Sequence, residues 1–265
     1  MKIAVLGAGH MGAWLVNELA KEHEVCIYDT DFHQTETIRH AFILSSYSDL
    51  RDFNPDILIN AVSLQNTIKA FERAAPFLSQ SCLLTDVASV KGRIPEYYKK
   101  CGFPFVSCHP MFGPTFANVR QLEEENAILI KESDPGGAQF FNNFFRARGL
   151  NIYECSFEEH DEMIAYSLTL PFASSMVFAA CLTTSAVPGT TFKKHHEIAK
   201  GLLSEDDYLL SEILFNSHSL LQLEKITGRL EFLKHVIRQK DLDEARKFFA
   251  QLRENIQNLG QYGPK

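Results

Sequence analysis

The chain has 265 residues, of which 45% are hydrophobic and 22% charged, a composition typical of a soluble globular protein with one or two domains. Its formal net charge of −7 argues against nucleic acid as the main partner, because binding to phosphates requires a basic face. We expect neither a signal peptide nor a membrane span, since the most apolar stretch, 168–182, is interrupted by Pro171 and by serines.

Six cysteines are spread along the chain, and none forms a Cys-x-x-Cys pair. Most fall in apolar runs, where cysteine usually behaves as a small buried hydrophobe. We therefore expect reduced thiols in a cytoplasmic protein, and we predict no metal site. Cys108 stands beside His109, but neighbouring residues on a strand point to opposite faces, which argues against a catalytic Cys-His pair.

The N-terminal segment carries a dinucleotide-binding pattern. Lys2–Leu6 is an apolar run that predicts a strand, and it leads into Gly7-Ala8-Gly9-His10-Met11-Gly12. Apolar residues at helical spacing follow, and a second strand, 24–29, then ends in an acid. A glycine motif alone is weak evidence, whereas strand, motif, helix, strand and acid in this order are specific.

Each glycine of the motif has its own physical reason. Gly7 permits the tight turn, Gly9 lets the backbone approach a pyrophosphate, and Gly12 lets helix and strand pack closely. The helix N-terminus, with His10 and Met11 in its first turn, offers free N–H groups and a partial positive charge to phosphates. We therefore predict that the motif binds the cofactor.

Asp29 lies about 20 residues after the first glycine, at the position where an acid contacts the adenosine ribose. A carboxylate there accepts hydrogen bonds from ribose hydroxyls and repels a 2′-phosphate, so we predict NAD rather than NADP as the cofactor. Ser63, which follows the strand predicted at 56–62, is a further candidate for the cofactor site.

Strands and helices continue to alternate up to residue 155, which predicts an α/β domain with a doubly wound parallel sheet, the Rossmann fold. Predicted strands at 56–62, 82–86 and 103–109 are separated by helices at 65–78 and 92–100. Further strands are expected at 126–130 and 150–155, with a phenylalanine-rich helix between them.

The segment Ser107–Pro114 places His109 at the end of its strand, because Pro110 and Pro114 cannot continue a sheet ladder. Ligands of open α/β sheets bind at the carboxyl ends of the strands, and a neutral imidazole there can accept a proton near pH 7. The alternative is a histidine that is merely hydrogen-bonded to backbone. Ser89 follows the neighbouring strand and could orient the imidazole.

The composition changes after residue 155, and only helices are predicted beyond it. We place a domain boundary there: 1–155 is the NAD-binding Rossmann domain, and 156–265 is an all-helical substrate and dimerisation domain. Ser156 and Glu159 resemble a capping box, and a long helix is predicted over 205–239. Because this helical half is so apolar, we predict a homodimer through this domain, with an intramolecular bundle as the alternative.

Together the motifs resemble the prephenate dehydrogenase family. The matching parts are the glycine motif, Asp86-Val87-Ala88-Ser89-Val90-Lys91, His109-Pro110-Met111-Phe112-Gly113-Pro114 and Glu159-His160-Asp161, in the order and spacing of the family. The resemblance implies oxidative decarboxylation of prephenate to 4-hydroxyphenylpyruvate, a step of tyrosine biosynthesis. It implies that His109 accepts the proton of the ring hydroxyl while hydride passes to NAD, and that Ser89 orients both.

Substrate binding departs from the family pattern at two positions. A histidine that many members carry in the helical domain corresponds to Phe172, and an arginine that holds a substrate carboxylate corresponds to Lys193, with Lys194 beside it. A lysine can pair with a carboxylate but lacks the bidentate fork of arginine. The candidate substrate-binding residues are Thr115, His160, Lys193 and Lys194.

Three alternatives to a prephenate dehydrogenase follow. An arogenate dehydrogenase would need a carboxylate for the substrate ammonium group, and residues 115–120 contain none, which favours prephenate. A related two-domain dehydrogenase would use a catalytic lysine and leave the His109 segment unexplained. A nucleotide-binding protein without catalysis would be consistent with Phe172 and Lys193. We expect neither a chorismate mutase domain in front nor a separate regulatory domain behind.

Overall fold

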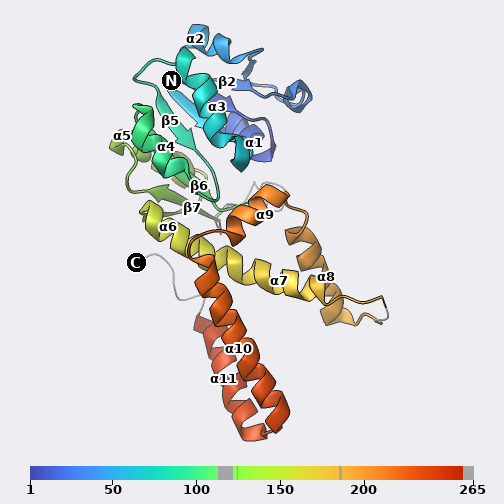
Figure 1. Ribbon diagram of the computed structural model, residues 1–265. Coiled ribbons are helices and arrows are strands. Elements are labelled where there is room, and N and C mark those ends of the chain that lie inside the picture. Colours follow the sequence, from blue (N-terminus) through green and yellow to red (C-terminus); the bar gives the residue numbers. More distant parts are fainter. Residues whose placement is uncertain (113–121, 124, 185–186, 259–265) are drawn as a thin grey trace. The chain divides into compact units, whose positions relative to one another are not determined.

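The computed structural model describes residues 1–112, 122–123, 125–184 and 187–258. The chain divides into two compact units (Figure 1). The first unit is Met1–Met163 with Asp206–Glu212, and the second is Ile164–Glu205 with Ile213–Lys265. The predicted boundary at 155 coincides with the end of the last strand, whereas the compact units divide eight residues later, after Met163.

Within the described residues, the first unit contains one eight-stranded sheet of order β3-β2-β1-β4-β5-β6-β7-β8. This order and the helical second half confirm the predicted fold class. The strands are β1 (Lys2–Leu6), β2 (Glu24–Tyr28), β3 (Phe42–Ile43), β4 (Ile57–Asn60), β5 (Leu83–Asp86), β6 (Phe105–Pro110), β7 (Asn126–Ile130) and β8 (Asn151–Cys155).

One pair of strands departs from the fully parallel sheet that was predicted. β7 runs antiparallel to β6, with His109 opposite Ile128 and Pro110 opposite Ala127, while all other neighbouring strands are parallel. Pro110, which has no N–H to donate, is the last residue of β6, as its chemistry requires. His109 therefore lies at the carboxyl end of the parallel part of the sheet, near its junction with the antiparallel part.

Helices cover both faces of the sheet. α1 (His10–Leu19) and α5 (Pro135–Arg146) pack on one face, and α2 (Leu50–Phe53), α3 (Thr67–Ala74) and α4 (Ile94–Cys101) pack on the other. Alternate side chains of each strand serve the two cores, since Ile3 and Val5 belong to the first and Ala4 and Leu6 to the second. Short 3₁₀ turns lie at η1 (Phe32–Thr35), η2 (Tyr47–Asp49), η3 (Leu64–Asn66) and η4 (Ala75–Phe77).

A capping box begins the helix after the sheet, as predicted. The Ser156 N–H donates to Glu159 Oε2 at 2.7 Å, and the Glu159 N–H donates to Ser156 Oγ at 3.1 Å. α6 (Phe157–Ile164) then passes through a π-helical segment, η5 (Ala165–Thr169), into α7 (Leu170–Ala180). The irregular turn comes just before Pro171, where a proline was expected to disturb the helix.

The stretch Phe157–Ala180 is long and apolar enough, by length and composition alone, to cross a membrane. Its first part, however, belongs to the sheet unit, where the side chain of His160 is completely buried. Only the 11 residues of α7 remain as a regular apolar helix, about half of the ~20 that a bilayer requires. We therefore interpret the first part of this stretch as a helix that packs on protein.

The long helix predicted over 205–239 is wrong, because two helices occupy this range. α9 (Asp207–Leu214) belongs mostly to the first unit, and α10 (Ser219–Gln239) belongs to the second. Asn216 causes the break, since its side-chain Oδ1 accepts the His218 N–H at 2.9 Å and its carbonyl accepts the Ser219 N–H. Such a local turn competes with helical hydrogen bonding.

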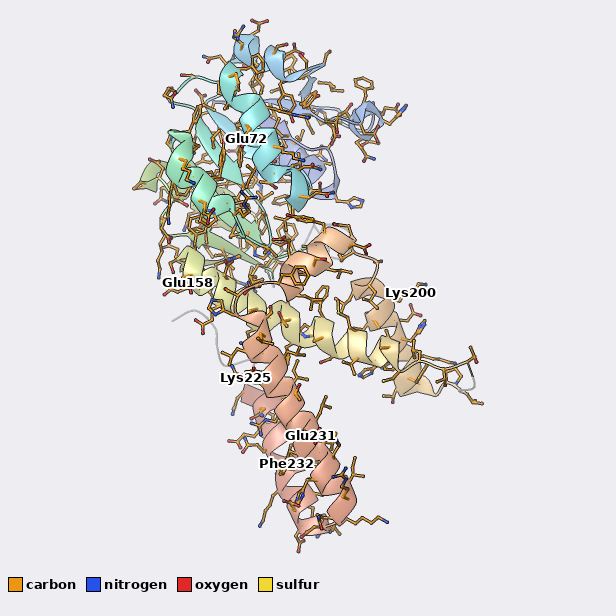
Figure 2. The ribbon with its side chains drawn as sticks, in the orientation of Figure 1. Glu72, Glu158, Lys200, Lys225, Glu231 and Phe232 are labelled. Atoms are coloured by element: carbon orange, nitrogen blue, oxygen red, sulfur yellow. The ribbon has the colours of Figure 1, made fainter. Side chains whose placement is uncertain are left out.

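In the second unit α10 forms a hairpin with α11 (Leu242–Asn258), and Figure 1 shows the two helices side by side. The rings of Phe232 and Phe248 meet edge to face at 5.1 Å between centroids and join the two helices. Lys225, Glu231 and Phe232 are labelled along α10 in Figure 2. α7 packs against α8 (Thr190–Leu202) and against α10 in the same unit.

Two adjacent glycines at the start of α5 provide a matched test of how closely this helix approaches the sheet. A Cβ at Gly137 would lie 2.6 Å from Leu83 Cδ2 and from Val106 Cγ2, whereas a Cβ at Gly136 would meet only Asp134 Oδ1 at 3.4 Å. We expect Gly137→Ala to lower the free energy of unfolding by about 1–3 kcal/mol, because the added methyl overpacks the core.

Gly136→Ala should leave the free energy of unfolding within about 0.5 kcal/mol of the parent value, or raise it slightly through helix propensity. Urea unfolding of both variants, followed by circular dichroism, measures the difference. Equal stability of the two variants would show that α5 does not approach the sheet this closely.

Candidate active site

The glycine loop between β1 and α1 has the geometry that the sequence predicts. Gly7 adopts φ +96°, and its N–H donates to the carbonyl of Tyr28 on β2 at 2.9 Å. A Cβ at Gly7 would lie 2.7 Å from the carbonyl oxygen of Ala61, and a Cβ at Gly12 would collide with the carbonyl oxygen of Gly7. Both positions therefore require glycine: a side chain has no space at either one, and the backbone conformation of Gly7 also disfavours other residues.

Gly9 has a different role, because its surroundings are open. It is the N-cap of α1, and no atom of another segment lies within 4 Å of where its Cβ would be. The helix α1 therefore begins at an open position, and its first N–H groups carry the positive end of the helix dipole. This arrangement fits a phosphate group.

Asp29 directly follows β2 and faces the glycine loop. Its Oδ2 accepts the N–H of Ala8 at 2.6 Å, and its Oδ1 accepts the N–H of Asp31 at 2.8 Å. These bonds fix the carboxylate beside the loop, and each oxygen retains capacity to accept a further hydrogen bond. The position is the one from which an acid contacts a ribose.

A cavity of about 500 Å³ lies over this loop and includes four of the predicted cofactor residues, Gly7, Gly9, Asp29 and Ser63. His10, Met11 and Gly12 do not line it, and the half-buried side chain of Met11 packs against the core. The remaining lining was not predicted: Leu6, Tyr28, Thr30, Gln34, Tyr47, Ala61, Val62, Asn66, Lys69, Ala70 and Arg73. Lys69 and Arg73 are two cations one helical turn apart on α3. Their spacing after β4 was the sequence signal from which this part of the lining could have been predicted.

His109 is buried near the end of β6 and contacts a second histidine. Its Nδ1 lies 3.1 Å from Nε2 of His160 on α6, and the two rings meet edge to face at 5.3 Å between centroids. His160 Nδ1 in turn lies 3.3 Å from Asp161 Oδ1. The capping box at Ser156 starts α6 at the position that delivers His160 to this contact.

Burial lowers the pKa of His109 well below its usual value of 6.5, and the charge of Lys91 and the neighbouring His160 lower it further. Burial also lowers the pKa of His160, although Asp161 partly opposes that shift. Both imidazoles are therefore neutral at pH 7. A neutral imidazole can accept a proton, as predicted for His109.

A buried polar cluster supports the ends of β5 and β6. Lys91 Nζ donates to Asp86 Oδ1 at 2.7 Å and to the Cys108 carbonyl at 2.8 Å, and neither charged side chain is exposed. Tyr98 donates its hydroxyl to Asp86 Oδ2 at 2.9 Å, and burial beside Asp86 raises the pKa of this phenol. Both oxygens of the Asp86 carboxylate thus accept structural hydrogen bonds.

Cys108 is also part of this cluster, since its thiol donates to the Asp86 carbonyl at 3.3 Å. Burial raises the pKa of the Cys108 thiol, which opposes formation of a nucleophilic thiolate. Its environment agrees with the expected structural role.

The remaining predicted site residues belong to other elements or fall outside the described residues. Ser89 is half-buried after β5, and among the described residues no hydrogen bond joins it to His109. Thr115 lies outside the described residues. Lys193 and Lys194 are exposed on α8 in the second unit, and Phe172 is buried on α7 in the same unit. His160 was expected to bind substrate, but its side chain is completely buried and contacts His109.

Residues 16–144 match the family described as "Prephenate dehydrogenase, nucleotide-binding domain". The chain is 24% identical over 217 residues to a Methanocaldococcus jannaschii protein named "Probable arogenate/prephenate dehydrogenase", an alignment that covers 74% of this chain and 48% of that protein. The chain spans about half the length or less of the curated relatives that it matches.

Two solved structures share the fold along nearly the whole chain. A prephenate dehydrogenase from Aquifex aeolicus, in complex with hydroxyphenyl propionate and NAD+, superimposes with a TM-score of 0.84 at 19% identity, covering 98% of each chain. An arogenate dehydrogenase from Synechocystis gives a TM-score of 0.78 at 20% identity, covering 98% of this chain and 100% of that one.

The buried cluster makes a prediction about stability. Lys91→Met leaves the Asp86 carboxylate buried without its counter-charge, and we expect the free energy of unfolding to fall by about 3–5 kcal/mol. The double variant Lys91→Met/Asp86→Asn removes both charges and should recover part of that loss. Thermal or urea unfolding gives the values, with exposed Lys99→Met on α4 as the control. A loss below about 1 kcal/mol in Lys91→Met would contradict the buried pair.

Proposed function

Because the chain belongs to the prephenate dehydrogenase family, we propose that it catalyses the NAD-dependent oxidative decarboxylation of prephenate to 4-hydroxyphenylpyruvate. The observation that carries the proposal is His109, a buried neutral imidazole at the carboxyl end of a strand in a dinucleotide-binding sheet.

The residues around the glycine loop fit NAD. Gly9 and the first turn of α1 would hold the pyrophosphate, Asp29 would bind the adenosine ribose, and Ser63 lies farther along the same cavity. When bound, NAD supplies the hydride acceptor for the reaction. The protein's contribution is to orient the reactants and to remove the hydroxyl proton.

His109 is the proposed proton acceptor. The ring hydroxyl of prephenate gives its proton to the imidazole, the carbon that carried the hydroxyl is oxidised, and the ring carboxylate leaves as carbon dioxide while the ring becomes aromatic. A buried neutral imidazole suits this step, because it accepts one proton without first losing one. Asp86 and Cys108 are occupied by structural hydrogen bonds and take no part in it.

Prephenate is favoured over arogenate on chemical grounds. Arogenate carries an ammonium group where prephenate has a side-chain ketone, so an arogenate site would include a carboxylate. Residues 115–120, just past the glycine turn, contain no acid. Lys193 and Lys194 are the cations proposed to pair with a substrate carboxylate, in place of the arginine expected from the resemblance.

A nucleotide-binding protein that has lost catalysis is the second candidate. Phe172 and Lys193 favour it, since they replace the histidine and arginine expected from the resemblance. These positions concern how the substrate carboxylates are held. They leave the proton-accepting imidazole intact.

We also propose a homodimer formed through the helical half. α10 exposes a row of large apolar side chains, Leu220, Leu223, Leu230, Leu233 and Ile237, and α11 exposes Phe249, Leu252 and Ile256. An exposed apolar area of this extent is unfavourable in water and typical of an interface between subunits. A second copy of the same chain is the simplest cover for it.

The role of His109 predicts a specific defect. His109→Asn should lower kcat with prephenate by about 100-fold or more, the scale of general base catalysis, while the dissociation constant of NAD stays unchanged. Turnover is measured from NADH absorbance and NAD binding by calorimetry, with exposed His40→Asn as a matched control. An unchanged kcat would remove His109 from the mechanism.

The lowered pKa of His109 predicts how the rate depends on pH. The imidazole must be neutral to accept a proton, so kcat/KM should stay on its plateau through pH 6.5 and fall only as the pH drops below that value. A profile that already declines between pH 7.5 and 6.5 would contradict a buried neutral base.

Asp29 predicts the cofactor preference. Asp29→Ala removes the carboxylate that would bind the ribose and repel a 2′-phosphate, so the ratio of kcat/KM for NAD over NADP should fall by about 10-fold or more. Asp31→Asn is the matched control, because Asp31 lies outside the cavity and caps η1. A fixed ratio in Asp29→Ala would exclude Asp29 as the ribose ligand.

The homodimer makes a further prediction. Light scattering after size exclusion should give a mass twice the 30.0 kDa of the chain, and the double variant Leu230→Glu/Leu233→Glu should give the single-chain mass. A parent protein of 30.0 kDa at micromolar concentration would contradict the dimer.

A further inference from the structure

His160 has a side chain with no exposed surface, and both of its ring nitrogens lie near a polar partner. Nε2 is 3.1 Å from His109 Nδ1, and Nδ1 is 3.3 Å from Asp161 Oδ1. The three side chains form a row from the end of β6 to the first turns of α6, all within the first unit. Because no part of His160 is exposed, its function must be exerted through these neighbours.

The protons of this row can be assigned from its chemistry. Each neutral imidazole carries one N–H donor and one lone pair, and a carboxylate only accepts. His160 therefore donates from Nδ1 to Asp161, which leaves its Nε2 with a lone pair. His109 must then carry its proton on Nδ1 to donate to that lone pair. The remaining nitrogen of His109, Nε2, holds the lone pair that can accept a proton.

We infer that His160, held by Asp161, is a positioning residue that fixes His109 as the Nδ1–H tautomer and directs its Nε2 lone pair toward the substrate hydroxyl. The tautomer follows from the row itself, whereas its use on a ring hydroxyl rests on the proposed function. Neutral imidazole in water prefers the opposite tautomer, with the proton on Nε2. Without His160, His109 would thus mostly present a donor where the reaction needs an acceptor.

The row also prepares His109 for the charge that it acquires. When the hydroxyl proton moves to Nε2, His109 becomes an imidazolium whose Nδ1–H still donates to His160. The carboxylates of Asp161 and Asp86 favour positive charge on His160, the next member of the row. On His109 itself, burial, Lys91 and the neighbouring His160 all oppose protonation. A hydrogen-bonded base with a third group behind it follows the logic of a catalytic triad.

Nitrogen NMR of the full-length protein tests the tautomer directly, without substrate. The chain has 10 histidines, so the His109 signals in a ¹⁵N-histidine sample are identified by their loss in His109→Asn. We expect a protonated Nδ1 and an unprotonated Nε2 at pH 7, and in His160→Leu we expect the proton to shift to Nε2. A proton on Nε2 of His109 in the parent protein would overturn the inference, whatever the variants do.

Turnover with prephenate tests the catalytic consequence. His160→Leu removes the acceptor and should lower kcat by about 100-fold with little change in KM or in NAD binding. His160→Gln places a carbonyl oxygen near the position of Nε2 and should recover at least about a tenth of the parent kcat. Glu162→Gln, an exposed change on the same helix, is the control. Equal losses in the Leu and Gln variants would reduce His160 to a packing residue.

The two experiments separate failure of this inference from failure of the proposed function. If the parent protein has the Nδ1–H tautomer but does not oxidise prephenate, the inference about His160 stands and the proposed substrate is wrong. If the parent protein oxidises prephenate while His109 is protonated on Nε2, the proposed function stands and the inference about His160 is wrong.

Discussion

The position of the His109 imidazole depends on the buried ion pair between Lys91 and Asp86. Lys91 spans from the end of β5 to the backbone of β6, because its ammonium group binds both the Asp86 carboxylate and the Cys108 carbonyl. The residue after Cys108 is His109, so the pair fixes the strand on which the imidazole is carried. Burial lowers the pKa of His109, and the same ammonium lowers it further. One buried charge thus both supports the end of β6 and favours the neutral form of His109.

The site is assembled from elements that are distant in sequence but adjacent in the sheet. The glycine loop after β1 and the acid after β2 form the nucleotide cavity, and the end of β4 completes it. β5 and β6 carry the polar cluster and His109, and α6 places His160 behind the imidazole. Apart from Tyr98 and His160, which reach the cluster from helices α4 and α6, these groups lie at the carboxyl ends of strands or just beyond them, where an α/β sheet binds its ligands. The nucleotide cavity and His109 thus both belong to the strand ends of the same sheet.

Features encoded by local chemistry were predictable from the sequence. Gly7, Asp29 and the capping box at Ser156 each follow from residue type and spacing, and the structure has them where they were expected. The proline at 110 correctly marked the end of β6.

Features that depend on long-range packing were not predictable. No local pattern indicates that α6 turns His160 toward β6, 51 residues earlier, so the sequence suggested a substrate ligand instead. The antiparallel direction of β7 is likewise set by pairing across the sheet. The break before α10 depends on the hydrogen bonds of Asn216, which interrupt an apolar spacing that otherwise continues.

The most direct test of the central claim is the initial rate of NADH formation by the purified full-length protein with prephenate and NAD, with arogenate in a parallel assay. We expect rapid NADH formation with prephenate and a much lower kcat/KM with arogenate. Preference for arogenate would leave the chemistry of His109 intact and contradict the assigned substrate. No NADH from either substrate, in protein shown to bind NAD, would contradict the proposed activity itself.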